Sequence, residues 1–201
     1  MSLNYTQLQT EIASYLARGN LTTKIPGFIT KGENYLNRRL RVLAMEQVET
    51  ESLAANAQTL AFSTIATKIV KINRIWLVRA EKPTEIVRLD QTQFLEARVD
   101  TAKEPAYWCA IGQTVYFDGP ADQAYTLYVE VTRGFDIATD STNWLSENHE
   151  EAYTWSALVQ AEGYMKNDPR IGTWKSQLDE VLKDIIREDK DRRGSGRAIM
   201  I

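Results

Sequence analysis

Apolar residues near the N-terminus recur every three or four positions, which is the spacing of one face of an α-helix. The stripe of this first helix is Tyr5, Leu8, Ile12, Tyr15 and Leu16. Asn4 is placed to cap the helix, and Gln7 can reach back to it as in a capping box. Gly19 and Asn20 form a stop signal.

A second helix is predicted to start near Thr22 or Thr23, with Pro26 in its first turn. Its stripe is Ile25, Phe28, Ile29, Leu36 and Leu40. Gly32 leaves room for close contact with another helix. A cluster of arginines, Arg38, Arg39 and Arg41, lies near its C-terminal end, where cations interact favourably with the helix dipole.

Between residues 45 and 140 the period changes to that of strands. Five strands are predicted, around Val70 to Val78, Glu85 to Leu89, Tyr107 to Ile111, Gln113 to Phe117 and Tyr125 to Val131. Gly112-Gln113 predicts a tight hairpin turn, and Asp118-Gly119-Pro120 a second connection. Asp90 can cap a short helix that runs through Phe94. We expect a small antiparallel sheet here.

After residue 140 the helical period returns. Ser146 is expected to cap a helix that carries Ala152, Tyr153, Leu158, Ala161 and Met165. Asp168-Pro169 predicts a new start, with a cap followed by proline at the first helical position. The stripe of this last helix is Ile171, Trp174, Leu178, Val181, Leu182 and Ile185.

These patterns predict an α+β fold that is mainly a four-helix bundle built from both chain ends, with an inserted small antiparallel β-rich lobe and an extended C-terminal tail. The predicted parts are residues 1–44 and 141–190 for the two halves of the bundle and 45–140 for the lobe. Residues 191–201 are expected to form a flexible arm, because the apolar stripe stops there.

Composition excludes several classes of protein. The chain has 201 residues, 43% hydrophobic and 25% charged, with a formal charge of -3. This suits a globular protein rather than a disordered chain or one with a long basic stripe for DNA. Cys109 is the only cysteine, so no intramolecular disulfide or thiolate metal cluster can form. No apolar run approaches the ~20 residues of a membrane span, and we expect a protein made in the cytoplasm.

Candidate chemistry is sparse. His149 is the only histidine and the only candidate for histidine acid–base catalysis, but it is expected in the solvated first turn of a helix. Gly194-Ser195-Gly196 is interpreted as flexible linker rather than as a serine site. Two acidic groups are interpreted as charged helix surface rather than as cation sites, namely Glu147, Glu150 and Glu151, and Asp184, Glu188, Asp189 and Asp191. With no phosphate-binding glycine loop, we expect no catalytic residue, no metal and no cofactor.

Aromatic residues cluster on the predicted strands, where they could stack on bases or pack in a core. They are Tyr107, Trp108, Tyr116, Phe117, Tyr125 and Tyr128. Because basic residues do not interleave with them, we favour core and cross-strand packing. Trp144 and Trp155 are candidates for either core or interface.

The last ten residues combine three arginines with an apolar tip and contain no acidic side chain. They are either a frayed terminus or an arm that orders when it docks in a groove or adds a strand to a partner sheet. The candidate docking residues are Arg192, Arg193, Arg197, Ile199, Met200 and Ile201.

Taken together, several motifs resemble the head-to-tail adaptor proteins of tailed bacteriophages. They are Asn4-Tyr5-Thr6, Ile25-Pro26, Glu33 to Arg38, Pro105-Ala106-Tyr107, Thr142 to Leu145, His149, Tyr153, Ala157-Leu158 and Asp168 to Trp174. The proline that we would expect after His149 is missing.

The resemblance implies a ring, typically of twelve copies, that sits on the portal protein, extends the DNA channel and offers a platform to the next tail component, a tail tube, nozzle or stopper protein. It implies a location at the head–tail neck of the virion and a docking arm, Arg192 to Ile201, that reaches the portal. It also implies that DNA passes through without sequence-specific binding and that the protein has no contact with a membrane. It implies no catalytic residues.

Two other hypotheses stay open at this point. One is a small DNA-binding regulator that uses the arginines of the second helix and of the tail. The other is a hydrolase or lyase that uses His149 with nearby glutamates, which predicts a concave pocket around that residue.

Overall fold

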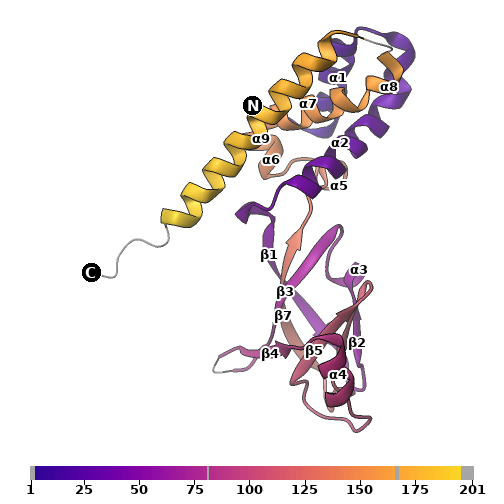
Figure 1. Cartoon of the computed structure of the whole chain (residues 1–201). Coiled ribbons are helices and arrows are strands. Elements are labelled where there is room, and N and C mark those ends of the chain that lie inside the picture. Colours follow the sequence, from indigo (N-terminus) through magenta and orange to yellow (C-terminus); the bar gives the residue numbers. More distant parts are fainter. Residues whose placement is uncertain (1–2, 81, 166–167, 196–201) are drawn as a thin grey trace. The chain divides into compact units, whose positions relative to one another are not determined.

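The computed structural model describes residues 3–80, 82–165 and 168–195. The chain divides into two compact units, of which one combines Met1–Ala44 with Phe135–Ile201 and the other is Met45–Gly134. Figure 1 shows helices in the first unit and the strands in the second.

The helical unit is built from seven α-helices of very different lengths among the residues described. They are α1 (Tyr5–Leu16), α2 (Ile25–Arg39), α5 (Ile137–Asp140), α6 (Trp144–Asn148), α7 (Glu150–Gln160), α8 (Glu162–Met165) and α9 (Arg170–Ser195). A 3₁₀ turn at Gly19–Lys24 leads into α2, and another, Leu43–Met45, precedes the first strand. The predicted capping box is confirmed, because Asn4 Oδ1 accepts the Gln7 N–H at 2.9 Å and Gln7 Oε1 accepts the Asn4 N–H at 3.0 Å.

Helix α7 is the centre of this unit and packs against α1, α2 and α9. It is buried on nearly all sides, as a helix surrounded by others must be. Its buried residues are Ala152, Tyr153, Thr154, Ser156, Ala157 and Leu158. Gly32 of α2 lies so close that a Cβ there would be 2.8 Å from the backbone nitrogen of Ala157, which confirms the predicted close contact.

The predicted start at Ser146 of the helix that carries Ala152 and Tyr153 is wrong, because α7 begins at Glu150 and Ser146 lies in the separate helix α6. Asn143, not Ser146, is the cap of α6, and its Oδ1 accepts the N–H groups of Leu145 and Ser146 at 3.1 Å. Ser146 lies three residues on and completes the box by accepting the Asn143 N–H at 2.9 Å. Asparagine and serine are both common at helix N-caps, so only the backbone conformation shows which of the two residues begins the helix. The helix then breaks at His149 before α7 starts.

Helix α9 has the predicted apolar stripe, and Ile171, Trp174, Leu178, Leu182 and Ile185 are buried. The Asp168 carboxylate accepts the Arg170 N–H at 3.0 Å at its start. The helix continues to Ser195, so the prediction of an extended tail from residue 191 is wrong for residues 191–195. Ion pairs across one helical turn, Arg192 with Glu188 and Arg193 with Asp189, support these last turns. Residues 196–201 lie outside the described part.

The second unit is built on one seven-stranded sheet with the order β1-β7-β3-β4-β5-β6-β2. Its strands are β1 (Glu46–Leu53), β2 (Thr59–Ala61), β3 (Ile69–Leu77), β4 (Thr84–Arg88), β5 (Tyr107–Ile111), β6 (Thr114–Phe117) and β7 (Tyr125–Arg133). Two short helices, α3 (Phe62–Ile65) and α4 (Gln91–Ala97), interrupt them. Gly112 at φ 61° occupies the two-residue turn between β5 and β6, as predicted.

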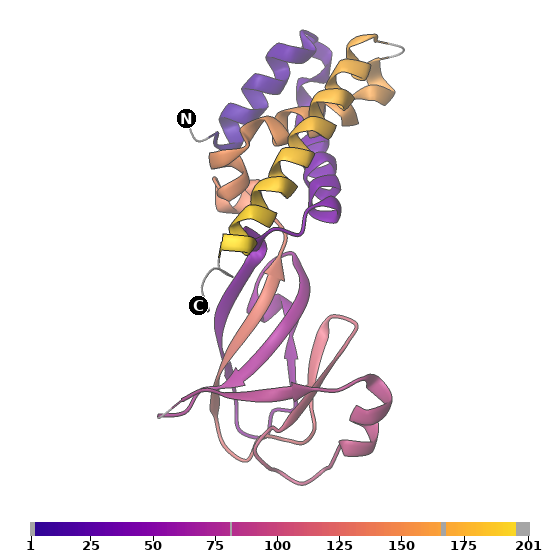
Figure 2. The same cartoon turned by 60° about the vertical axis from the view of Figure 1, so that its left-hand side comes forward.

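Every strand of this sheet contributes a side chain to a single hydrophobic core, so the sheet curls around that core. The contributors include Leu53, Leu60, Ile72, Ile86, Trp108, Val115 and Val129. Figure 2 shows α4 following one end of β4, with the turn from β3 at the other end. Asp90 caps α4 by accepting the Gln93 N–H at 2.9 Å, which confirms that short helix.

The prediction of a mainly α-helical four-helix bundle with a small antiparallel lobe is wrong. The fold is α+β, with a seven-stranded mixed sheet as large a feature as the helices. β4 and β5 pair in parallel through Val87↔Tyr107 and Arg88↔Trp108, because the chain passes through α4 before it returns to the sheet. Hydrophobic alternation predicts strands but not their direction. The sequence patterns did not predict strands β1 and β2.

Candidate interaction surfaces

His149 lies between α6 and α7, and its side chain is only 13% exposed rather than solvated. Its Nε2 is 3.0 Å from Oε2 of Glu188 on α9, and its Nδ1 is 3.9 Å from Oε1 of Glu151. The Nε2 contact is at ion-pair distance but lacks the angles of a hydrogen bond. The Trp144 ring packs edge-on against the imidazole, with the centroids 5.1 Å apart. These contacts join α6 and α7 to α9.

Two of the six predicted docking residues, Arg192 and Arg193, lie on the last described turns of α9. The Arg192 guanidinium lies 5.3 Å from the centroid of the Trp144 ring. Asp189, the ion-pair partner of Arg193, also accepts the Leu43 N–H at 2.6 Å. The two arginine side chains are still 45% and 42% exposed, so each can meet a partner. Arg197, Ile199, Met200 and Ile201 lie outside the described residues.

The DNA-binding hypothesis uses the arginines at the C-terminal end of α2, and two of the three have contacts within this segment. Arg41 Nη1 donates to the carbonyl oxygens of Asn37 and Leu40, both at 2.5 Å. The Arg39 guanidinium lies 5.0 Å from the centroid of the Tyr35 ring. Arg38 is exposed. Arg41 thus satisfies carbonyl groups at the C-terminus of the helix, whereas Arg39 packs on a ring of its own helix.

The aromatic residues of the strands divide between core and surface. Trp108 and Phe117 are fully buried, and the indole N–H of Trp108 donates to the Ile86 carbonyl at 3.1 Å. Tyr125 is nearly buried, and burial raises the pKa of its hydroxyl, which donates to Asp122 at 2.7 Å. Tyr107 is the most exposed of them, at 38%. The predicted core packing is thus confirmed for the three buried rings.

The two tryptophans left undecided, Trp144 and Trp155, are half-buried in the helical unit. Trp155 packs edge-on against Tyr15, with the ring centroids 5.3 Å apart. Both rings are therefore engaged by neighbours within their own unit.

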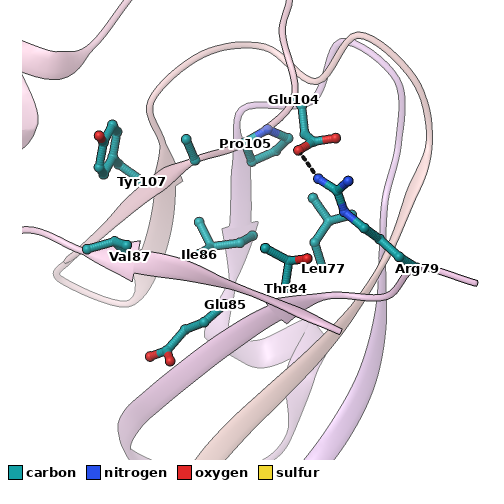
Figure 3. A pocket seen from close by; sticks show the side chains of 10 residues that line it. Leu77, Arg79, Thr84, Glu85, Ile86, Val87, Glu104, Pro105 and Tyr107 are labelled. Atoms are coloured by element: carbon teal, nitrogen blue, oxygen red, sulfur yellow. Dashed lines mark hydrogen bonds and ion pairs between the residues drawn. The ribbon is translucent and has the colours of Figure 1, made fainter. Parts of the chain in front are cut away.

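A hollow of about 260 Å³ opens beside β4, as Figure 3 shows. The first residues of β4 pair with β3 and the last two with β5, so the sheet parts between these pairings. Leu77 and Ile86 line the hollow and are almost fully buried. The Arg79–Glu104 ion pair lies at one end of it, and Val87 and Tyr107 lie at the other. The hollow is therefore lined by both apolar and charged side chains.

Asp118 binds the backbone of residues 106 and 107, which border this hollow. Its carboxylate is fully buried, and Oδ1 accepts the N–H groups of Ala106 and Tyr107 at 3.1 and 3.2 Å. Its Oδ2 pairs with Lys103 Nζ at 2.7 Å. Sequence reasoning treated this aspartate as a turn residue, because Asp-Gly-Pro has the composition of a turn. Only the fold shows that this aspartate is buried and that it accepts hydrogen bonds from Ala106 and Tyr107.

Within the described residues, no three His, Cys, Asp or Glu side chains converge to hold a metal ion. Among the same residues, no helix is both long and apolar enough to cross a membrane. The hollow at β4, a second one along α1 and a third one near Tyr125 are lined without His149.

Comparison with curated proteins gives no match. A family model described as SU10 adaptor protein matches residues 3–200. The match agrees with the resemblance drawn from the sequence motifs at the level of a phage adaptor protein. Because it spans nearly the whole chain, the protein belongs to the SU10 adaptor protein family.

Proposed function

We propose that this phage adaptor protein forms a ring of about twelve copies below the portal, where it extends the DNA channel and offers the attachment platform for the tail. The observation that carries the proposal is the family match over residues 3–200. In a closed ring, one face of each subunit meets a different face of the next. Two compact units in one chain provide separate surfaces for neighbours in the ring and for the components above and below it.

The proposed contact with the portal is the end of α9 and the residues that follow it. Arg192 and Arg193 are half-exposed at the C-terminal end of a 26-residue helix. Basic side chains at this end also interact favourably with the helix dipole. The remaining docking residues of the proposal are Arg197, Ile199, Met200 and Ile201. Arginines would provide charge-assisted hydrogen bonds, and the apolar tip would fill a groove.

DNA is proposed to pass through the ring without sequence-specific binding. A net charge of -3 disfavours tight binding to phosphates, whose affinity comes mainly from lysine and arginine contacts. The proposal assigns no catalytic step to the chain, and His149 serves to pack α9 against α6 and α7. The assembled protein would lie at the neck of the virion.

The test is to mix the full-length protein with the portal rings of the same phage and to measure the product by mass photometry and electron microscopy. A chain that ends at Asp191, and so lacks the whole arm, tests docking, and Arg187→Ala is its control, because Arg187 lies on α9 outside the docking segment and is 75% exposed. We expect rings on portals with the full chain and with the control, and weak binding after truncation. If the full chain forms no ring on portals, the adaptor role is refuted, whereas equal binding after truncation refutes only arm docking.

A further inference from the structure

β1 is the terminal strand of the seven-stranded sheet (Figure 1). All eight of its residues pair with β7 in one register, from Glu46↔Thr132 to Leu53↔Tyr125, without a bulge. In the described part of the chain, no strand pairs with the other edge of residues 47–53. A regular, proline-free edge strand presents a row of backbone donors and acceptors that another strand can use.

The side chains of β1 that point toward the core side of the sheet are mostly polar. Glu49 lies opposite Val129, and Glu51 lies opposite Leu127, and both of these partners are fully buried. Both glutamate side chains therefore lie on the core-facing side of the sheet, on its edge strand. Both are half-buried. Burial raises the pKa of Glu51, and the charge of Glu49 raises it further.

No counter-charge accompanies these two groups. Among the residues that the structure describes, neither Glu49 nor Glu51 has a hydrogen-bond or ion-pair partner. Partly buried carboxylates are costly unless a cation or a donor approaches them. A basic side chain on an added strand would lie within cross-strand distance of them.

The same charges determine which strands can be added. Antiparallel pairing of β1 with β1 of a second copy would bring the glutamates of the two strands near each other, and like charges across strands are destabilising. Edge strands commonly avoid pairing with themselves in this way. Val48 precedes Glu49, points to the opposite face and is 61% exposed, so it offers an apolar contact beside the two acidic positions.

We propose that β1 is a strand-addition site for an extended segment of a partner protein that carries basic side chains at two alternate positions. Backbone hydrogen bonds along the open edge provide affinity, and Glu49 and Glu51 select the basic side chains. An apolar residue that flanks these basic side chains on the added strand packs near Val48. The proposal does not depend on the ring or on portal docking.

The probe is a blocked seven-residue peptide of alternating lysine and valine, titrated into the full-length protein by fluorescence anisotropy and mapped by amide hydrogen exchange. A peptide of alternating glutamate and valine is the competitor of opposite charge. We expect the lysine peptide to bind and to slow exchange in residues 47–53, while the glutamate peptide does neither. No binding, or protection confined to other segments, overturns the proposal.

Charge reversal at the two glutamates makes the test specific. Glu49→Lys with Glu51→Lys should weaken binding of the lysine peptide by about tenfold or more and should allow binding of the glutamate peptide. Glu49→Gln with Glu51→Gln, which keeps the side-chain shape, should give an intermediate loss without a change of preference. The control is Glu96→Lys, an exposed position of α4, compared with Glu49→Lys alone, so that both variants change net charge by the same amount and only one changes this edge. Equal weakening by the control would mean that net charge alone attracts the peptide, and the proposal would fail.

Discussion

Gly32→Ala adds one methyl group where α2 crosses the central helix α7. The new Cβ would lie 2.7 Å from Ser156 Oγ, 2.8 Å from the Ala157 nitrogen and 2.9 Å from the Ser156 carbonyl carbon. Two of these atoms belong to the backbone and cannot rotate away, so the helices must separate. Overpacking of this kind costs about 1–3 kcal/mol, and alanine recovers about 1 kcal/mol through its helix propensity. We therefore expect a net loss of up to about 2 kcal/mol.

Urea denaturation followed by far-UV circular dichroism measures this loss from the shift in midpoint at constant slope. The matched control is Gly27→Ala on the same helix, where a Cβ meets nothing within 4 Å. That variant should gain up to about 1 kcal/mol, so the two substitutions should differ in sign. Ser156→Ala relieves only the hydroxyl contact and should not rescue Gly32→Ala. Equal stability of the two glycine variants would refute the close approach of α2 to α7.

Three further predictions concern buried or capping groups. Tyr153→Phe removes a hydroxyl that donates to buried Glu33 at 3.0 Å and should cost about 1–3 kcal/mol in urea, and an unchanged midpoint would contradict this role. Asp118→Ala leaves two backbone N–H groups without their acceptor and should cost at least about 2 kcal/mol, whereas a smaller cost would mean that water replaces the carboxylate. Hydrogen bonds from Arg170 lower the pKa of Asp168 from 3.8 to about 2, so its stabilising contribution is complete above pH 3.8 and disappears as pH falls through about 2. Carboxyl NMR titration checks this, and Arg170→Ala should return the pKa toward 3.8.

Local signals in the sequence were sufficient for several elements. The capping box of Asn4 and Gln7 is confirmed because both partners lie within one turn of the same helix. The stripe of α9 is confirmed because a long helix with one buried face shows its period without its neighbours. The turn at Gly112 needs a positive φ, which glycine adopts at no steric cost.

The candidate interaction residues were only partly visible from the sequence. Arg192 and Arg193 were singled out by composition, but their place on a helix depends on ion pairs that extend α9 past residue 191. His149 was expected in solvent, yet it is covered by Trp144 and by α9. Residues far apart in sequence make that cluster, and no local pattern reveals it.

β1 shows most clearly where reasoning from the sequence stops. Alternation predicts a strand when one face is apolar, and β1 has Glu49 and Glu51 at its core-facing positions. Only its register with β7 reveals which face these residues occupy and that the edge is open.

By itself, the sequence determined the long helices α1, α2 and α9, the caps at Asn4 and Asp90, the tight turn at Gly112 and the motifs of a phage adaptor, because each depends on residues within a few positions of one another. Tertiary structure decided the seven-stranded mixed sheet, the parallel pairing of β4 with β5, the burial of Asp118 and the acidic edge of β1. These features depend on which distant segments meet. Strand direction, register and burial are set by the pairing and packing of these distant segments, and the local hydrophobic period of the chain does not encode them.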